Sequence, residues 1–305
     1  MLFLPDEKKQ MKYIVLTLSI GLVISLGGCG TGKQLAQQTH IADSYYKAGN
    51  YIEALSLYSE IIDQYENNNN LTGCPVYTRA GESALKDNHP KLAINYLKKA
   101  RNTSYTNAST YFLLAEGYKQ IDNLSLEINT LSDYLKLYPD GKDAAIVKKR
   151  LFYTYVESEN FDKALELWPE IYANNQSDTE LLEGYFIANK GLDNTDKCND
   201  IAEKLLGLDK DNITALVWFA KQYYNKAEDR YQIEIKAYDK KKTKKQYNIL
   251  IKALEIVTVD FKKSLSYFKK IYTLQPTSKN AQYLSHIYGR LSDKKKAAYY
   301  KKISK

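Results

Sequence analysis

The segment around Cys29 brings together a thiol, glycines and a lysine, residue types that could take part in chemistry. Gly27, Gly32 and Lys33 have the spacing of a phosphate-binding loop, in which backbone amides and the lysine hold a nucleotide. Gln34, however, stands where such a loop needs Ser or Thr to bind magnesium, and no strand–helix–strand pattern follows. We therefore expect no nucleotide here, which leaves the Cys29 thiol as the reactive group.

The other residues that could hold a metal or catalyse a reaction are dispersed along the chain. Cys74 and Cys198 form no Cys-x-x-Cys motif, and they are expected to lie beyond disulfide reach. The three histidines fall in different regions: His40, His89 and His286. Carboxylates recur at spacings typical of solvated helix faces, as at Glu157 and Glu159. The sequence predicts no metal, no cofactor and no enzymatic activity.

The residues before Cys29 have the pattern of an export signal. Met11-Lys12 is basic, residues 13–26 are uncharged and largely apolar, and Leu26-Gly27-Gly28-Cys29 follows. The 14-residue run is shorter than a membrane-spanning helix requires. The segment resembles a bacterial lipoprotein signal, with Cys29 as the lipid-modified first residue of the mature chain. The alternative is an uncleaved anchor helix.

This resemblance implies that residues 1–28 are a signal peptide and that residues 29–34 are a linker. Residues 1–10 are then either an extended basic region or an incorrectly assigned start. Gly30, in place of Asp, favours the outer membrane by analogy with lipoprotein sorting in Gram-negative bacteria. Residues 30–33 also lack the acidic run typical of surface export in Bacteroides-type bacteria. We therefore expect a lipid-anchored outer-membrane protein that faces the periplasm.

From residue 35 onward the chain contains a helical repeat. Small and aromatic residues surround a glycine in the order Ala42, Tyr45, Gly49, Tyr51, Ala54 and Tyr58. This order resembles the tetratricopeptide repeat (TPR), in which pairs of helices stack into a solenoid. The packing position in the second helix recurs at Ala54, Ala93, Glu127, Ala164, Cys198, Ser264 and Ala297. The sequence thus predicts an all-α TPR helical-hairpin solenoid of about 6–7 repeats over residues 35–305, with Glu127 weakening the third.

One interval in this series, from Cys198 to Ser264, is about one repeat too long. The additional stretch still has helical patterns, and a lysine-rich segment divides it in two. We expect a lengthened helical hairpin in the sixth repeat, at about residues 213–276, whose tip carries Lys240, Lys241, Lys242, Lys244 and Lys245. The lipid-attachment motif, the repeat array and this hairpin together resemble periplasmic TPR lipoproteins of Bacteroides-type bacteria.

Charge is distributed unevenly along the chain. Residues 220–305 carry 22 Lys and Arg against seven Asp and Glu, whereas residues 1–219 carry 22 against 29. Such a basic region suits an anionic partner, either a lipid surface or an acidic protein. The alternative is that the lysines only keep a helical hairpin solvated. The expected location in the envelope disfavours nucleic acid.

The first helix of each repeat is expected to line the concave face of a TPR stack. Repeat position places the following residues there as a partner-binding groove: Tyr46, Lys47, Glu82, Lys86, Phe112, Glu116, Lys119, Lys149, Tyr153, Glu183, Lys190, Lys221 and Tyr224. Aromatic side chains with charges of both signs suit an extended peptide or a protein helix. The alternative is an ordinary polar groove. Tyr45 and Trp218 are expected in the packed interior.

These observations favour a lipid-anchored scaffold that mediates protein–protein interactions in the bacterial cell envelope. A second interpretation is a glycan-binding accessory lipoprotein of an outer-membrane nutrient-uptake system, which would need exposed aromatic clusters. A third is a hydrolase or ligase, which would need two carboxylates with shifted pKa values converging in a cleft.

Overall fold

A computed structural model describes residues 30–173 and 175–305. The predicted signal peptide, residues 1–28, and the lipidation site, Cys29, lie outside the described residues. The described chain is all-α, as the repeat predicts, and contains fourteen α-helices and one 3₁₀-helix. It forms two compact units, divided between residues 106 and 107.

The first unit contains two helical hairpins. Its helices are α1 (Gly30–Lys47), α2 (Tyr51–Asn67), α3 (Tyr77–Lys86) and α4 (Pro90–Ala100), with a 3₁₀-helix at Leu71–Gly73. Residues 30–34, which we predicted to be a linker, belong to α1, because this segment contains no proline and each of its two glycines costs a helix only about 1 kcal/mol.

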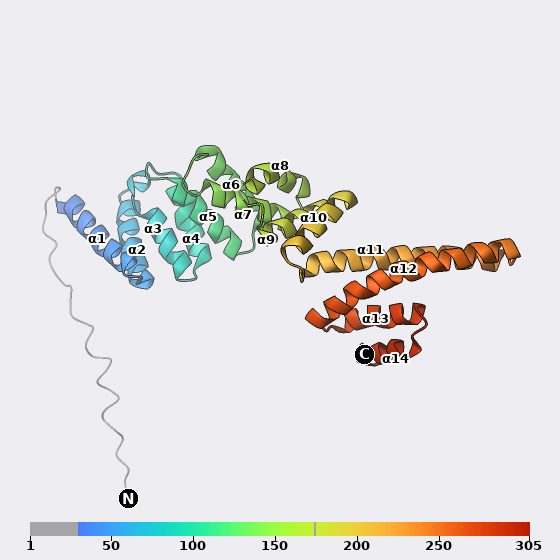
Figure 1. The fold of residues 1–305 in the computed structure, drawn as a ribbon. Helices are drawn as coiled ribbons and strands as arrows, with labels where there is room; N and C mark the ends of the chain where they lie inside the picture. Colours follow the sequence, from blue (N-terminus) through green and yellow to red (C-terminus); the bar gives the residue numbers. More distant parts are fainter. Residues whose placement is uncertain (1–29, 174) are drawn as a thin grey trace, which may run out of the picture. The chain divides into compact units, whose positions relative to one another are not determined.

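The second unit contains five helical hairpins. Its helices are α5 (Ala108–Gln120), α6 (Leu124–Leu137), α7 (Ala144–Glu157), α8 (Phe161–Tyr172), α9 (Thr179–Gly191), α10 (Thr195–Leu208), α11 (Ile213–Lys240), α12 (Lys244–Leu274), α13 (Ser278–Arg290) and α14 (Lys294–Ile303). In this unit α11 and α12 have 28 and 31 residues, whereas the other helices have 10 to 14. They run side by side as a long arm (Figure 1).

A recurring backbone turn joins the two helices of six hairpins in the described chain. The second residue after the first helix has a positive φ, between 56° and 82°, at Gly49, Asn88, Asp122, Glu159, Asp193 and Ser292. The amide of the next residue donates to the carbonyl five positions earlier, which is the Schellman closure of a helix end. The α11–α12 hairpin instead turns through residues 241–243, without a positive φ.

Small side chains lie where the two helices of a hairpin meet, which supports the predicted packing positions. Ala54, Ala93, Ala164, Cys198 and Ser264 are fully buried, and the thiols of Cys74 and Cys198 are free. One prediction about the buried aromatic residues needs correction, however. Tyr45, predicted to be interior, is 38% exposed, because no described helix precedes α1 and packs over that face.

Candidate functional site

In the first unit, two of the four predicted groove residues, Tyr46 and Glu82, interact with each other. Burial, and then the carboxylate of Glu82, raises the pKa of Tyr46 above its usual range. The hydroxyl of Tyr58 donates to Asp43 Oδ1 at 2.6 Å, and Arg79 forms an ion pair with the same carboxylate. The remaining two predicted residues of this unit, Lys47 and Lys86, are exposed to solvent.

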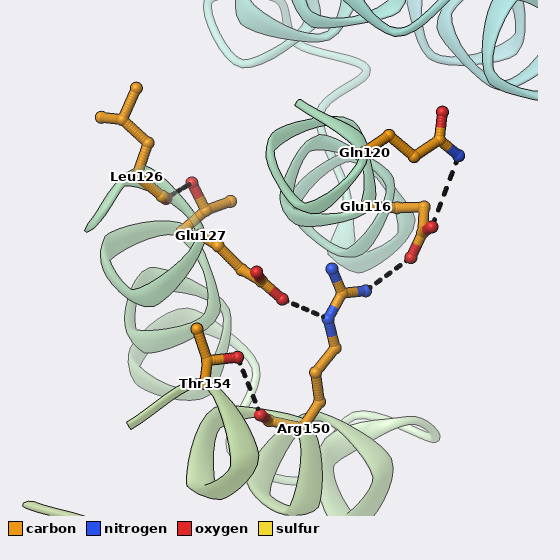
Figure 2. A network of polar contacts seen from close by, with 7 residues as sticks. Glu116, Gln120, Leu126, Glu127, Arg150 and Thr154 are labelled. Carbon is orange, nitrogen blue, oxygen red and sulfur yellow. Dashed lines mark hydrogen bonds and ion pairs between the residues drawn. The ribbon is translucent and has the colours of Figure 1, made fainter. Parts of the chain in front are cut away.

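In the second unit, Arg150 on α7 joins two carboxylates from separate helices (Figure 2). Its Nε donates to Glu127 Oε1 on α6 at 2.7 Å, and its Nη1 donates to Glu116 Oε2 on α5 at 2.9 Å. The guanidinium also lies 5.8 Å from the ring centroid of Phe112. Only 2% of the Glu127 side chain and 12% of the Arg150 side chain are exposed, so this is a buried ion pair.

This network accounts for the charged residue at the third packing position. A small residue would let α5 and α6 approach closely, whereas Glu127 receives a guanidinium from the following hairpin. The arrangement links three helices of the unit through one side chain. Both carboxylates are therefore tied to Arg150, which gives them a packing role rather than the free geometry of an acid–base pair.

Next to Arg150 on α7, Lys149 contacts the N-terminal end of α9. Its Nζ donates to Asp178 Oδ2 at 2.5 Å and lies 5.9 Å from the ring centroid of Tyr153. Burial, and then the carboxylates of Glu180 and Asp178, raises the pKa of Tyr153 above its usual range. The amide of Asn212 donates to Glu183 Oε1 at 2.7 Å. Lys149 and Glu183 are thus held by an ion pair and a hydrogen bond between elements, whereas Tyr153 is held by ring contacts with Lys149 and Phe152.

A pocket of about 550 Å³ lies between α9 and α11, both within the second unit. Its wall combines apolar and basic side chains, among them Phe186, Lys190, Ile213, Val217, Trp218 and Lys221. Of the predicted groove residues, Lys190 and Lys221 therefore come together at one concave site. No Asp or Glu lines this pocket.

Trp218 forms part of the pocket wall, which corrects the prediction that it lies in the interior. It is partly buried, and its indole Nε1 donates to Asn199 Oδ1 at 2.8 Å. Its ring packs edge-on against Phe186, with 5.3 Å between the ring centroids. The tryptophan is therefore fixed in place while one face contributes to the pocket. An amphipathic indole needs a hydrogen-bond partner when it is partly buried, and Asn199 supplies it.

The electrostatics of the pocket favour a negatively charged ligand. Burial, and then the nearby amines of Lys279 and Lys190, lowers the pKa of Lys221. These three amines form no ion pair within 4.0 Å in the part of the chain that the structure describes. An anion placed between Lys190 and Lys221 would relieve their mutual repulsion and replace the water that burial has removed.

The last two predicted groove residues lie outside this pocket. The hydroxyl of Tyr224 and Nδ1 of His286 are 2.9 Å apart, and the Tyr224 ring packs edge-on against Phe261. Lys119, at the end of α5, is exposed. Within the second unit, the predicted groove residues are therefore distributed among two ion-paired clusters, the pocket, the base of the arm and the exposed end of α5.

Sequence analysis missed two residues that matter here, Arg150 and Lys279. Arg150 lies 34 residues after Glu116, one repeat period, so the signal for its position was present. The sequence prediction named the adjacent residue, Lys149, in its place. Lys279 begins α13, the first helix after the arm, and no repeat spacing related it to Lys221.

The predicted basic tip lies at the end of α11, the turn and the start of α12. All five lysines are exposed. Lys242 approaches Asp239 at 3.9 Å, a contact between two largely exposed side chains that contributes little to stability. Beside the tip, Tyr247, Ile249 and Ile251 are also exposed. The tip is therefore both cationic and partly apolar.

Neither membrane-spanning helices nor metal sites are found in the described chain. None of its helices is both long enough and apolar enough to cross a lipid bilayer. Across residues 30–173 and 175–305, no cluster of three or more His, Cys, Asp or Glu side chains could hold a metal ion.

Comparison with known proteins identifies the fold. No protein-family model matches the chain, and no curated protein sequence matches it. Among solved structures, the C-terminal part of a TPR repeat-containing protein from Cytophaga hutchinsonii superposes with a TM-score of 0.57 and 14% sequence identity. The alignment covers 87% of this chain and 93% of that one. The chain has a TPR fold.

A second similar structure is a TPR protein from Parabacteroides merdae, with a TM-score of 0.49 and 14% identity. That alignment covers 90% of this chain and 93% of the other. The TPR fold rests on the Cytophaga structure, and at 14% identity the ligand has to be argued from the residues of this chain.

Proposed function

We propose that this TPR protein is a lipid-anchored scaffold of the bacterial cell envelope that binds a segment of another protein. The pocket between α9 and α11 is the observation that supports binding, because it places a fixed tryptophan beside two lysines that lack acidic partners. Aromatic and basic side chains around a concave site are typical of peptide recognition. The anchor rests on the lipid-attachment motif that ends at Cys29.

Photo-crosslinking in native membranes tests the binding site. A photoreactive amino acid at Gln222, which lines the pocket, should capture a partner protein. Ser266, exposed on α12, is a matched control position where the same probe should capture none. Equal capture at both positions, or capture at Ser266 alone, would show that the pocket is not the binding site.

The proposed location is the periplasmic face of the outer membrane. The motif ending at Cys29 and the glycine that follows it support an outer-membrane lipoprotein, and the absence of acidic residues at positions 30–33 favours the inner side. Added protease should then degrade the protein only after the outer membrane is permeabilised. Degradation in intact cells would place it on the cell surface instead.

The glycan-binding alternative is less well supported by the structure. Sugar binding would need a platform of exposed aromatic rings, whereas the most exposed tyrosines of the described chain lie on separate elements: Tyr45, Tyr105, Tyr247 and Tyr299. Two lysines line the pocket together with the tryptophan, and they suit anions better than neutral sugars. We therefore favour a protein partner.

We also propose that the basic tip of the arm contacts an anionic surface. Exposed lysines next to exposed apolar side chains suit a layer of acidic lipid headgroups, which attracts the amines while the apolar groups enter the interface. Replacing Lys241, Lys242, Lys244 and Lys245 by Glu should abolish binding to anionic vesicles at low salt. Unchanged vesicle binding would show that the lysines only solvate the turn.

A further inference from the structure

The pocket between α9 and α11 has two lysines in its wall that form no ion pair with an acidic residue. Elsewhere in that unit, Lys148 pairs with Glu170 at 2.6 Å, and Lys270 pairs with Asp211 at 2.8 Å. Lys190 and Lys221 line the pocket and have no such partner among the described residues. The site therefore holds positive charge that the fold does not neutralise.

A third cation contributes to the same charge from the next repeat. Lys279, on α13, is close enough to Lys221 to lower the pKa of its amine. Lys190 and Lys221 in the pocket wall and Lys279 outside it carry like charges that repel each other, and the partial burial of Lys221 reduces the screening by water. A ligand with a single negative charge would leave most of this repulsion in place, whereas one with two or more would remove it.

Another part of the wall is apolar. Phe186, Val217 and Trp218 line it, and the hydrogen bond from the indole to Asn199 fixes the tryptophan. A volume of about 550 Å³ is within the usual range of small-ligand pockets, so it can hold a few side chains but not a folded surface. A simple inorganic anion would leave this apolar wall in contact with water.

We propose that the pocket recognises an internal acidic peptide segment in which two carboxylate side chains flank one bulky apolar side chain. The apolar side chain packs against Trp218 and Phe186, and the carboxylates pair with Lys190 and Lys221. Lys279, outside the pocket wall, adds to the positive electrostatic potential of the pocket. This inference rests on the proposed function, since it names the chemistry of the segment that the scaffold binds.

Peptide binding to the full-length chain in mild detergent tests the inference. The probe is a fluorescent ten-residue peptide with blocked ends and the central order Glu, Phe, Glu, measured by anisotropy. The wild-type protein should bind it, with an affinity that falls as salt rises. Replacing both glutamates by glutamine, or the phenylalanine by alanine, should weaken binding at least about tenfold, the effect of one lost charged or aromatic contact.

Variants of the protein make the assignment specific. K190Q and K221Q should each weaken binding about tenfold, because each loses one charge-assisted contact. K236Q is the matched control: it removes the same charge from the exposed distal part of α11, and it should bind as the wild type does. Circular dichroism of each variant checks that the helices are retained.

Several outcomes would overturn the inference. Equal binding of the glutamine peptide, or wild-type affinity in K190Q and K221Q, would exclude recognition of the carboxylates. Binding only when the peptide has a free C-terminus would show that a terminal carboxylate is recognised instead. Displacement by inorganic phosphate or a mononucleotide at micromolar concentration would assign the pocket to a different ligand. Capture of a partner at Gln222 without peptide binding would leave the scaffold intact and refute only this chemistry.

Discussion

Replacing Arg150 by methionine should destabilise the second unit strongly, while a further change at Glu127 should restore much of the loss. Methionine keeps the apolar stem of the arginine but removes the guanidinium that donates to Glu127 and Glu116. Glu127 would then be a carboxylate with 2% of its side chain exposed and no cation beside it. Removing one partner from a buried ion pair typically costs about 3–5 kcal/mol.

The two carboxylates should contribute unequally to this cost. Glu116 is 36% exposed and can return to water, so its pair with Arg150 should account for no more than about 1 kcal/mol. Glu127 cannot return to water, so it should account for the remainder of the destabilisation. E127A also places the usual small residue of the repeat at this position. We therefore expect R150M to cost about 3–5 kcal/mol and E116Q less than about 1 kcal/mol, with E127A/R150M more stable than R150M alone.

Urea denaturation of the four proteins, followed by circular dichroism, measures these differences. Repeat proteins often unfold in parts, so hydrogen exchange of the α6 and α7 amides should accompany it as a local measure. Exchange should quicken most in R150M and slow again in E127A/R150M. A buried ion pair at Arg150 would be refuted if the free energy of unfolding of R150M were within about 0.5 kcal/mol of the wild-type value. It would also be refuted if E127A/R150M were less stable than R150M.

Three further predictions concern other parts of the chain. Cys29→Ala should abolish incorporation of labelled fatty acid, because only the thiol can accept the lipid, and equal labelling of both proteins would refute the lipid-attachment motif. Leucine at Ala54 or Ala93, both fully buried, should overpack the first unit at a cost of about 1–3 kcal/mol, measured by thermal unfolding, and unchanged melting would refute the repeat register. The hydrogen bond from Lys149, and then the Leu181 amide, lowers the pKa of Asp178, so its stabilisation is present above about pH 4 and is lost as pH falls through the folded pKa. K149M should flatten this part of the acid-unfolding curve, whereas an unchanged curve would show that the pair contributes nothing.

The sequence predicted the helices and their packing positions because these depend on local spacing. The repeat of small residues fixed which faces of the second helices are buried, and Ala164 and Cys198 lie there as expected. Most of the turns, by contrast, could not be read from glycine alone. In the described chain only Gly49 is a glycine with positive φ, whereas Asn88, Asp122 and four other non-glycine residues adopt the same conformation.

The candidate site was harder to predict, because it depends on small rotations and on distant segments. A shift of one residue along a helix turns the side chain by about 100° around the helix axis. A prediction that is one position off therefore names Lys149 in place of Arg150. Tryptophan is a large apolar residue of the kind found in a protein core. Only the hydrogen bond to Asn199 and the pocket beside it show that Trp218 lies in the pocket wall. Lys279 lies near Lys221 only because α13 returns beside α11 after the whole arm.

The position of the arm explains how this fold can leave such a pocket open. Residues 213–225 of α11 have the length of an ordinary first helix and carry the pocket wall, so the lengthened part of the arm begins just beyond it. There Arg290 of α13 donates to Glu228 Oε2 at 3.0 Å, and its guanidinium lies 3.9 Å from the ring centroid of Tyr231. These contacts hold α13 against the start of the extension, which keeps Lys279 near Lys221. The extension thus contributes to the charge of the pocket indirectly, by supplying the surface on which the last hairpin is held.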